Sequence, residues 1–456
     1  MRLRAVLLAL LLLAPSGCGP TSRLKLNLTP IPVERRIGTK VFLHTEKEAA
    51  EGPLIRSGRA QAVLARILER YMPYYPLKSE IPVDISISPS PIPNAFSVPG
   101  HIVVNLGLIP CMKTEAQLAF VIGHELGHIT GRHIGERYTQ SVLLSIGEEF
   151  LKQKLGSLGS LAGTVGGSLY MATYSRSQEY EADMFGVRYM AEAGYDTQEA
   201  AYALSEIEAC ARETLKEMGV EEKDQRGLGG LIERLLADHP ETVKRIKEVQ
   251  MESLNYRRSP NRGYDPESYR WLLGWASERK RLMVKIYGAI YAAKKEKDNA
   301  YRKLNEAKKA LESSSFEKPI MANANLLLAE GYFLYGDYET AHELAKEAYS
   351  IKPDYYIAYK LAGAAALKMN SPKGYSLAAE SFSMCFEGKL KDRSYCKAMG
   401  SCFDETCLLG AIKGFCLSKN ERMCKRYCAL EYRYYAKKGA ILKLPAAFFK
   451  YCLRRR

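Results

Sequence analysis

The stretch His124-Glu-Leu-Gly-His128 decides the local fold in this 456-residue sequence. On an α-helix, side chains four residues apart lie about 40° apart around the axis, so His124 and His128 can direct imidazole nitrogens toward one metal ion. The run from Lys113 to Ile122 predicts this helix, because apolar residues recur at helical spacing after a capping Thr114. Two metal ligands are therefore placed by spacing alone.

Glu125 follows the first histidine and points to a neighbouring part of the same helix face. From there it can take a proton from water at the metal without binding the metal itself, which is the position of a general base. A catalytic zinc ion usually has three protein ligands and one open position. A third ligand must therefore be found elsewhere in the chain.

The third ligand is predicted to be Glu179, in the helical stretch 175–186. A metzincin would place a third histidine at Ile134, but His133 stands one residue early, so we expect it to be a polar residue at the helix end. Asp183 lies one turn beyond Glu179 and can orient one of the two imidazoles. Glu181 lies on the opposite side of that helix and is expected to be solvated or paired.

The H-E-L-G-H motif, followed by S-R-x-x-E-x-E-A-D at residues 175–183, resembles the HtpX and CAAX prenyl protease family of gluzincin zinc peptidases, especially its soluble periplasmic BepA-like branch. Segments 93–109 and 238–246 resemble further parts of that family. The resemblance covers residues 55–253. It implies an α+β zinc-peptidase domain with a small sheet and one catalytic Zn²⁺.

Two residues after the motif pair are given alternative roles. His239 either caps the helix that starts near Pro240, or lies at the open zinc position, where it would stabilise the oxyanion or block the metal in the resting enzyme. Arg245 resembles the family arginine and is expected to pair with Asp183 or Glu179. The alternative for Arg245 is a surface charge.

Peptide hydrolysis is the reaction that this ligand set implies. Asn94, Ala95 and Phe96 are predicted to bind substrate along a strand edge, which would favour extended, non-native chains. The alternative is that this segment only closes a small sheet. The glycine-rich stretch 155–169 predicts a mobile flap over the site or, alternatively, a plain surface connection.

The first residues predict export from the cytoplasm. Basic residues precede an apolar run at residues 5–14, so residues 1–17 indicate a signal peptide, and the following arm extends over 18–54. Cys18 resembles the lipidated cysteine of a bacterial lipoprotein, with plain signal cleavage as the alternative. The expected location is the periplasm, with a lipid tether to the outer membrane.

The sequence changes character near residue 254. Residues 254–277 are predicted to be a connector, and 278–390 to be tetratricopeptide-like repeats in which Gly288, Ala329 and Gly363 recur at equivalent positions. Residues 391–456 form a cysteine-rich region, since eight of the eleven cysteines lie in the final 72 residues. Disulfides are expected there, with the pairing left open because eight cysteines allow 105 pairings. Cys111 and Cys210 are either paired or free.

The formal net charge of +15 fits solvated helices or anionic surfaces, and no motif indicates a nucleic-acid partner. The predicted fold is mainly α: a gluzincin domain, a repeat array and a helical disulfide-stabilised cap. The predicted function is hydrolysis of misfolded or misassembled proteins, especially outer-membrane proteins, that the repeats recruit. Outer-membrane assembly machinery is a further expected partner of the repeats. The alternative is a periplasmic chaperone or assembly scaffold whose zinc site is latent or structural.

Overall fold

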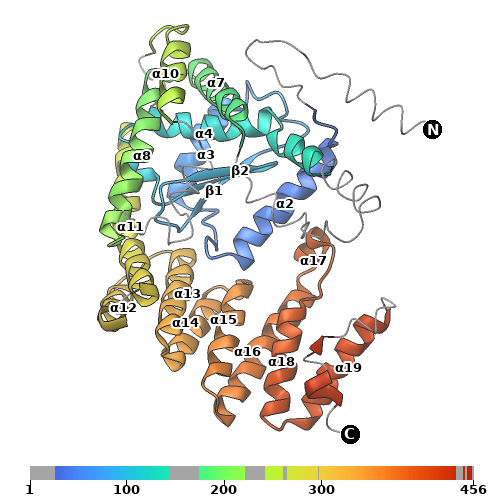
Figure 1. Cartoon of the computed structure of the whole chain (residues 1–456). Coiled ribbons are helices and arrows are strands. Elements are labelled where there is room, and N and C mark those ends of the chain that lie inside the picture. Colours follow the sequence, from blue (N-terminus) through green and yellow to red (C-terminus); the bar gives the residue numbers. More distant parts are fainter. Residues whose placement is uncertain are drawn as a thin grey trace, which may run out of the picture.

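The computed structural model describes residues 26–142, 174–220, 242–259, 264–295, 297–437, 445–446 and 449–453. These residues form a mainly helical molecule with one small sheet, as the sequence predicts (Figure 1). Within these ranges no helix is long and apolar enough to cross a membrane. The predicted signal peptide, Cys18 and the glycine-rich stretch 155–169 lie outside the described residues.

The sheet has the strand order β1-β3-β2 among the described residues. Strand β1 (Asp84–Ser88) runs parallel to β3 (His101–Asn105), and β2 (Ala95–Val98) runs antiparallel to β3. The turn between β2 and β3 contains Gly100 at φ 100°, a left-handed conformation that glycine adopts without strain. Because β2 stands last in the strand order, it is an edge strand, and among the described residues its side away from β3 has no ladder hydrogen bonds.

The motif helix α4 (Glu115–Thr130) is buried along nearly its whole length. Its first turn is capped as predicted: the Thr114 hydroxyl accepts a hydrogen bond from the Gln117 amide at 3.2 Å. Helix α7 (Arg176–Glu192) begins with a complete capping box at Ser175. Because a Cβ on Gly123 would lie only 3.2 Å from the Gly186 backbone, glycines allow α4 and α7 to approach closely.

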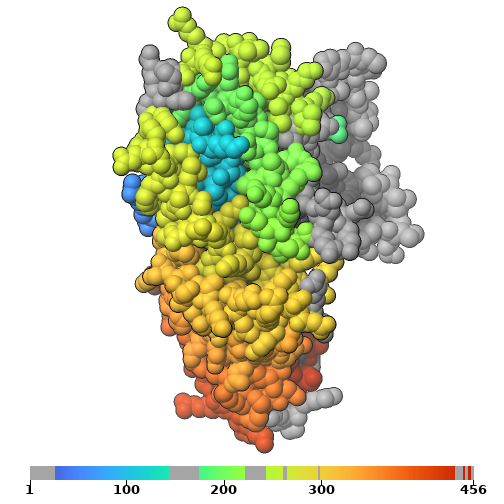
Figure 2. Space-filling model, turned by 90° about the vertical axis from the view of Figure 1, so that its left-hand side faces the viewer, coloured from blue at the N-terminus to red at the C-terminus, as the bar shows by residue number. Residues whose placement is uncertain are grey.

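Three further helices surround this pair, namely α3 (Arg59–Tyr71), α8 (Glu199–Glu217) and α10 (Thr242–Ser253). The long helix α11 (Pro266–Lys295) begins inside the segment 254–277 that the sequence assigns to a connector. Its first half packs on the sheet-containing part, where the buried Tyr269 hydroxyl donates to the Met112 carbonyl at 2.6 Å. In Figure 2 its yellow surface continues downward to the orange helices.

The remaining helices lie mostly below the sheet, and most of them stack as antiparallel neighbours (Figure 1). They are α12 (Lys297–Glu312), α13 (Lys318–Tyr335), α14 (Tyr338–Ile351), α15 (Tyr356–Lys368), α16 (Pro372–Lys391), α17 (Arg393–Met399), α18 (Glu405–Leu417), α19 (Glu421–Lys437) and the π-helical turn η5 (Phe449–Leu453). Their identity as tetratricopeptide repeats stays a prediction. The small residues act in packing, since a Cβ on Gly363 would lie 2.4 Å from the Phe382 ring.

Helix α2 (Ile31–Glu48) joins the two parts of the molecule. At its C-terminal end Glu48 accepts a 2.8 Å hydrogen bond from Lys360 and also pairs with Lys389. Asn323 and Tyr355 donate to backbone carbonyls of the following loop, residues 49–52. The face of the array turned toward α2 is thus partly occupied by the N-terminal segment of the same chain.

The described cysteines are joined in pairs. The disulfide bonds are Cys111–Cys210, Cys385–Cys407, Cys396–Cys402, Cys416–Cys424 and Cys428–Cys452. Cys416, Cys424 and Cys428 lie close enough to hold an ion, but each is oxidised and offers no thiolate.

Candidate metal centre

Helices α4 and α7 bring together the three residues predicted to bind metal. The Nε2 atoms of His124 and His128 lie 3.0 Å apart, and the Glu179 carboxylate lies 3.6 Å and 3.4 Å from them. All three side chains are buried. Zinc bonds of about 2.0–2.2 Å in tetrahedral geometry separate neighbouring ligand atoms by about 3.3 Å. Two imidazoles and a carboxylate at these distances therefore fit a zinc ion.

Asp183 and Arg245 surround this ligand set. The Asp183 Oδ1 atom lies 2.8 Å from Nδ1 of His124, so the carboxylate fixes this imidazole with Nε2 directed to the metal position. Arg245, from α10, donates two 2.7 Å hydrogen bonds to Asp183 and lies 2.8 Å from Glu179. Of the alternatives for Arg245, the structure shows the paired, buried one, and the pairing involves both carboxylates.

Burial and the contacts among these side chains set the charge states of Asp183, Arg245 and His128. Burial alone would raise the pKa of Asp183, but the Arg245 guanidinium and the hydrogen bonds outweigh it and lower that pKa. Burial likewise opposes the charge on Arg245, yet Asp183 and Glu179 raise its pKa. Desolvation lowers the pKa of His128 well below its usual value, which favours the neutral imidazole that a metal requires. All of these charge states suit a metal centre.

Glu125 has the surroundings expected of a general base. Its side chain is almost fully buried beside the ligands, and its Oε2 atom has no hydrogen-bond partner among the described residues. An unpartnered buried carboxylate oxygen is costly unless a ligand or water satisfies it. This oxygen provides a second indication that the site accommodates a metal and a water molecule.

His133 lies at a helix end as predicted, directly after α4, but its surroundings differ from those of a plain polar residue. It is buried, and its Nδ1 atom lies 2.8 Å from Nδ1 of His128. Its Nε2 atom lies 3.2 Å from Oε2 of Glu181, so Glu181 is paired, as one of its predicted alternatives states. The sequence did not predict this contact, which arises because the chain turns back on α4 after Gly131. The sequence feature that could have indicated this contact is a histidine five residues after the predicted ligand His128.

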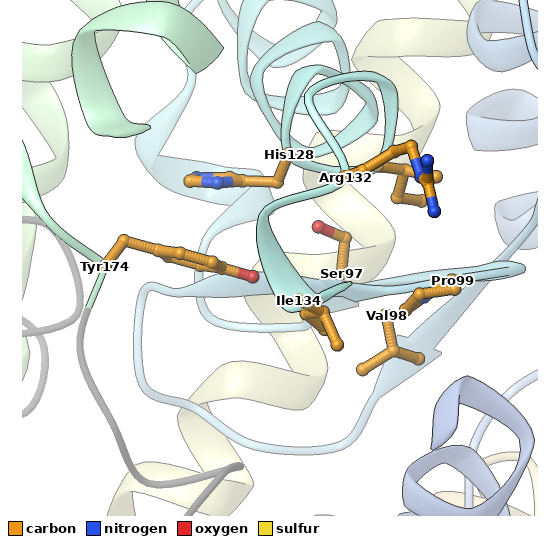
Figure 3. Close-up of a pocket in the computed structure, with 8 residues that line it drawn as sticks. Ser97, Val98, Pro99, His128, Arg132, Ile134 and Tyr174 are labelled. Carbon is orange, nitrogen blue, oxygen red and sulfur yellow. The ribbon is translucent and has the colours of Figure 1, made fainter. Parts of the chain in front are cut away.

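A small pocket opens beside His128, between α4 and strand β2 (Figure 3). It is lined mainly by apolar groups, and Tyr174 stacks on the His128 ring with centroids 3.8 Å apart. The pocket residues are Ser97, Val98, Pro99, His128, Ile129, Arg132, Ile134 and Tyr174. The buried Ser97 hydroxyl has no hydrogen-bond partner within the part of the chain that is described.

The edge of β2 lies next to this pocket. The Asn105 amide donates to the Asn94 carbonyl, so this is a hydrogen-bonded pair of the ladder between β2 and β3. Along an antiparallel ladder, hydrogen-bonded pairs alternate with pairs that are not hydrogen-bonded. The backbone groups of Ala95 and Ser97 therefore point to the free edge, whereas those of Phe96 face β3. Of the predicted substrate-binding residues, only Ala95 presents its backbone outward. Ser97 is a site residue that the sequence did not reveal.

His239 lies outside the described residues, so its two alternative roles remain predictions. The described part of the predicted site consists of the three predicted ligands on α4 and α7, the predicted base Glu125, and the Asp183–Arg245 pair.

Known proteins match this region of the chain. Residues 59–253 match Peptidase family M48. The chain is 38% identical over 114 residues to a mitochondrial metalloendopeptidase OMA1 of Arabidopsis thaliana, a match covering 25% of this chain and 23% of that protein. It is 23% identical over 231 residues to the OMA1 of Schizosaccharomyces pombe, with 50% and 64% covered. It is 31% identical over 116 residues to a beta-barrel assembly-enhancing protease of Escherichia coli, with 23% and 24% covered.

The chain spans less than two thirds of each of these relatives. The M48 match and the metalloendopeptidase names support a zinc metallopeptidase, as the motifs predict. A more specific assignment to the BepA-like repeat branch does not follow, because relatives of both kinds match.

The predicted location, a periplasmic lipoprotein tethered to the outer membrane, is wrong: several of the relatives of this M48 region are mitochondrial metalloendopeptidases. A short apolar run after basic residues does not define the compartment.

Proposed function

We propose that this protein is a zinc-dependent endopeptidase that hydrolyses extended segments of non-native proteins. The observation that supports it most is the Glu125 carboxylate oxygen that has no hydrogen-bond partner in the described part of the chain and is buried beside two imidazoles and the Glu179 carboxylate. A zinc ion bound by these three residues would supply Lewis-acid chemistry, which polarises the scissile carbonyl and makes water nucleophilic near neutral pH.

Residues of the chain are proposed to transfer the proton and to hold the ligands in position. Glu125 accepts the proton of the attacking water and delivers it to the leaving amine nitrogen. Asp183 and Arg245 hold His124 and Glu179 in position, so that no reorganisation is needed during the reaction. His239 is proposed either to stabilise the oxyanion or to cap its helix, and an alanine substitution with zinc and turnover measurements separates these roles.

Substrate binding is proposed along strand β2. An extended peptide would bond to the outward backbone groups of Ala95 and Ser97, a mode that depends little on side-chain identity. One substrate side chain next to the scissile bond would enter the pocket between Val98 and Tyr174. Because the pocket lining is mainly apolar, we propose a preference for a small apolar residue there.

The identity of the substrates is a finer part of this proposal. We propose misassembled membrane proteins, including outer-membrane barrels, as substrates, and the similarity to the bacterial beta-barrel assembly-enhancing proteases supports this choice. Recruitment is proposed through the helices from α11 to α16. Since the end of α2 covers part of the array face turned toward it, recruitment would use surfaces that α2 leaves open.

The deciding experiment is Glu125→Gln, assayed on an unfolded protein such as reduced casein. We expect hydrolysis to vanish while bound zinc and the melting temperature stay unchanged; Glu278→Gln, on an exposed side chain, is the matched control. Normal hydrolysis by Glu125→Gln would refute the proposal. Unchanged cellular function with lost hydrolysis would favour the scaffold alternative. A single defined cleavage would indicate processing of one precursor.

A further inference from the structure

We propose that His133 and Glu181 position the ligand His128 through an ordered chain of two hydrogen bonds, and that they thereby set the affinity of the site for zinc. This inference rests on the proposed metal site. It assigns a function to His133 and Glu181, which belong neither to the predicted ligands nor to the Asp183–Arg245 pair and are distinct from the general base.

The backbone after α4 is shaped to bring His133 back to the helix. Arg132 adopts φ 54°, a left-handed conformation that is unfavourable for a non-glycine residue. Its guanidinium is held by Glu34 of α2, at 2.7 Å and 3.1 Å, and by the Thr29 carbonyl at 2.6 Å. A Cβ on Gly131 would lie 2.4 Å from Nε2 of His133. The turn therefore has both the contacts that hold it and the space that the imidazole needs.

Donor and acceptor roles along the chain follow from the contacts. The Nε2 atom of His128 faces the ligand atoms of His124 and Glu179, so the proton of the neutral ring resides on Nδ1. His128 Nδ1 then donates across the 2.8 Å contact to Nδ1 of His133. His133 carries its own proton on Nε2 and donates it to Glu181 at 3.2 Å. Each contact has one donor and one acceptor.

The two histidine ligands are thus supported in different ways. His124 is held by the Asp183 carboxylate, which pairs with Arg245, whereas His128 is held by the His133 imidazole, which the Glu181 carboxylate orients. The Glu181 side chain is 24% exposed, so its carboxylate is partly solvated. Because residues that orient ligands usually contribute about 10–100-fold to metal affinity, the chain through His133 should have an effect of this size.

The test measures zinc affinity of the metal-free full-length protein by competition with a chromogenic chelator, without substrate. His133→Phe keeps a buried ring but offers no acceptor, and we expect affinity to fall about 10–100-fold. His133→Asn places an amide oxygen where Nδ1 stands and should stay within about threefold of the wild type. The same two substitutions at His342, a buried histidine of the array, are the matched controls and should leave zinc affinity unchanged.

Equal affinities for wild type and His133→Phe, or an equal loss in His133→Phe and His133→Asn, would overturn the proposal. If His133→Phe loses its cooperative thermal transition, His133→Gln replaces it in the comparison with His133→Asn. The glutamine amide reaches the position of Nε2 and not that of Nδ1. Weaker binding by His133→Gln than by His133→Asn supports the proposal, and equal binding refutes it. Since no substrate is present, this outcome is independent of the hydrolysis test on Glu125→Gln.

Discussion

Arg245 on α10 holds Asp183 on α7 with two parallel hydrogen bonds, Nε to Oδ2 and Nη2 to Oδ1, both of 2.7 Å. Its third nitrogen lies 2.8 Å from Glu179. A single planar guanidinium thus contacts both a predicted metal ligand and the carboxylate that orients another ligand. This arrangement depends on the fork geometry of arginine and not on charge alone.

Replacing Arg245 with lysine should therefore weaken the site although the charge is kept. A single ammonium cannot serve both buried carboxylates, and we expect the free energy of unfolding to fall by about 3 kcal/mol, together with a lower zinc affinity. Urea unfolding and zinc titration measure the two effects. Arg258→Lys, at an exposed arginine that pairs with the buried Asp196, is the control, and we expect it to change stability far less. Similar effects at both positions would contradict this account.

Gly127→Ala should separate α4 from α7. The added Cβ would lie 2.8 Å from the Ala182 carbonyl and 2.9 Å from the Phe185 Cβ, so the helices must move apart and with them His128 and Glu179. We expect a lower melting temperature and weaker zinc binding. Gly274→Ala in α11 meets nothing within 4 Å and should stabilise the protein by up to about 1 kcal/mol. Zinc binding that survives Gly127→Ala unchanged would show that the close approach is dispensable.

Acid should loosen the contacts that Asp404, at the start of α18, makes with Lys360 and Lys389 inside the array. Burial disfavours the charge on Asp404, but Lys360 and Lys389 outweigh this and lower its pKa to about 2. A depressed pKa means that the stabilisation, about 2 kcal/mol, is present above pH ~4 and is lost as pH falls toward ~2. Urea unfolding between pH 6 and 2.5 should show this loss in the wild type and less of it in Asp404→Asn. An identical pH dependence of the two proteins would be evidence against it.

The Cys111–Cys210 bond should stabilise the sheet-containing part. It links the 3-10 turn η1 (Ile109–Cys111) before α4 to helix α8, across a sequence separation of 99 residues. Closing a loop of this length restricts the unfolded chain, so the double substitution to alanine should lower the free energy of unfolding by about 2–5 kcal/mol. Guanidinium unfolding measures this change. A loss well below 1 kcal/mol would mean that the packing of α8 is sufficient without the bond.

Residues linked through one or two helical turns are those for which sequence analysis succeeds best. The spacing of His124 and His128, the cap at Thr114 and the relation of Glu179 to Asp183 all follow from helix geometry, and the structure places them as expected. The backbone direction at Ser97 could not be read in this way. It depends on the register between β2 and β3, and a shift of one residue would turn Phe96 outward instead.

The sequence by itself determined the metal-binding residue types, their local helices and the peptidase class. Only the tertiary structure decided that His133 supports His128, that Arg245 bridges two carboxylates, and how the cysteines pair. Helical periodicity relates residues within a few turns, whereas each of these contacts needs segments that meet through packing. The left-handed turn at Arg132 is held by Glu34, 98 residues earlier in the chain, and no local pattern encodes that distance.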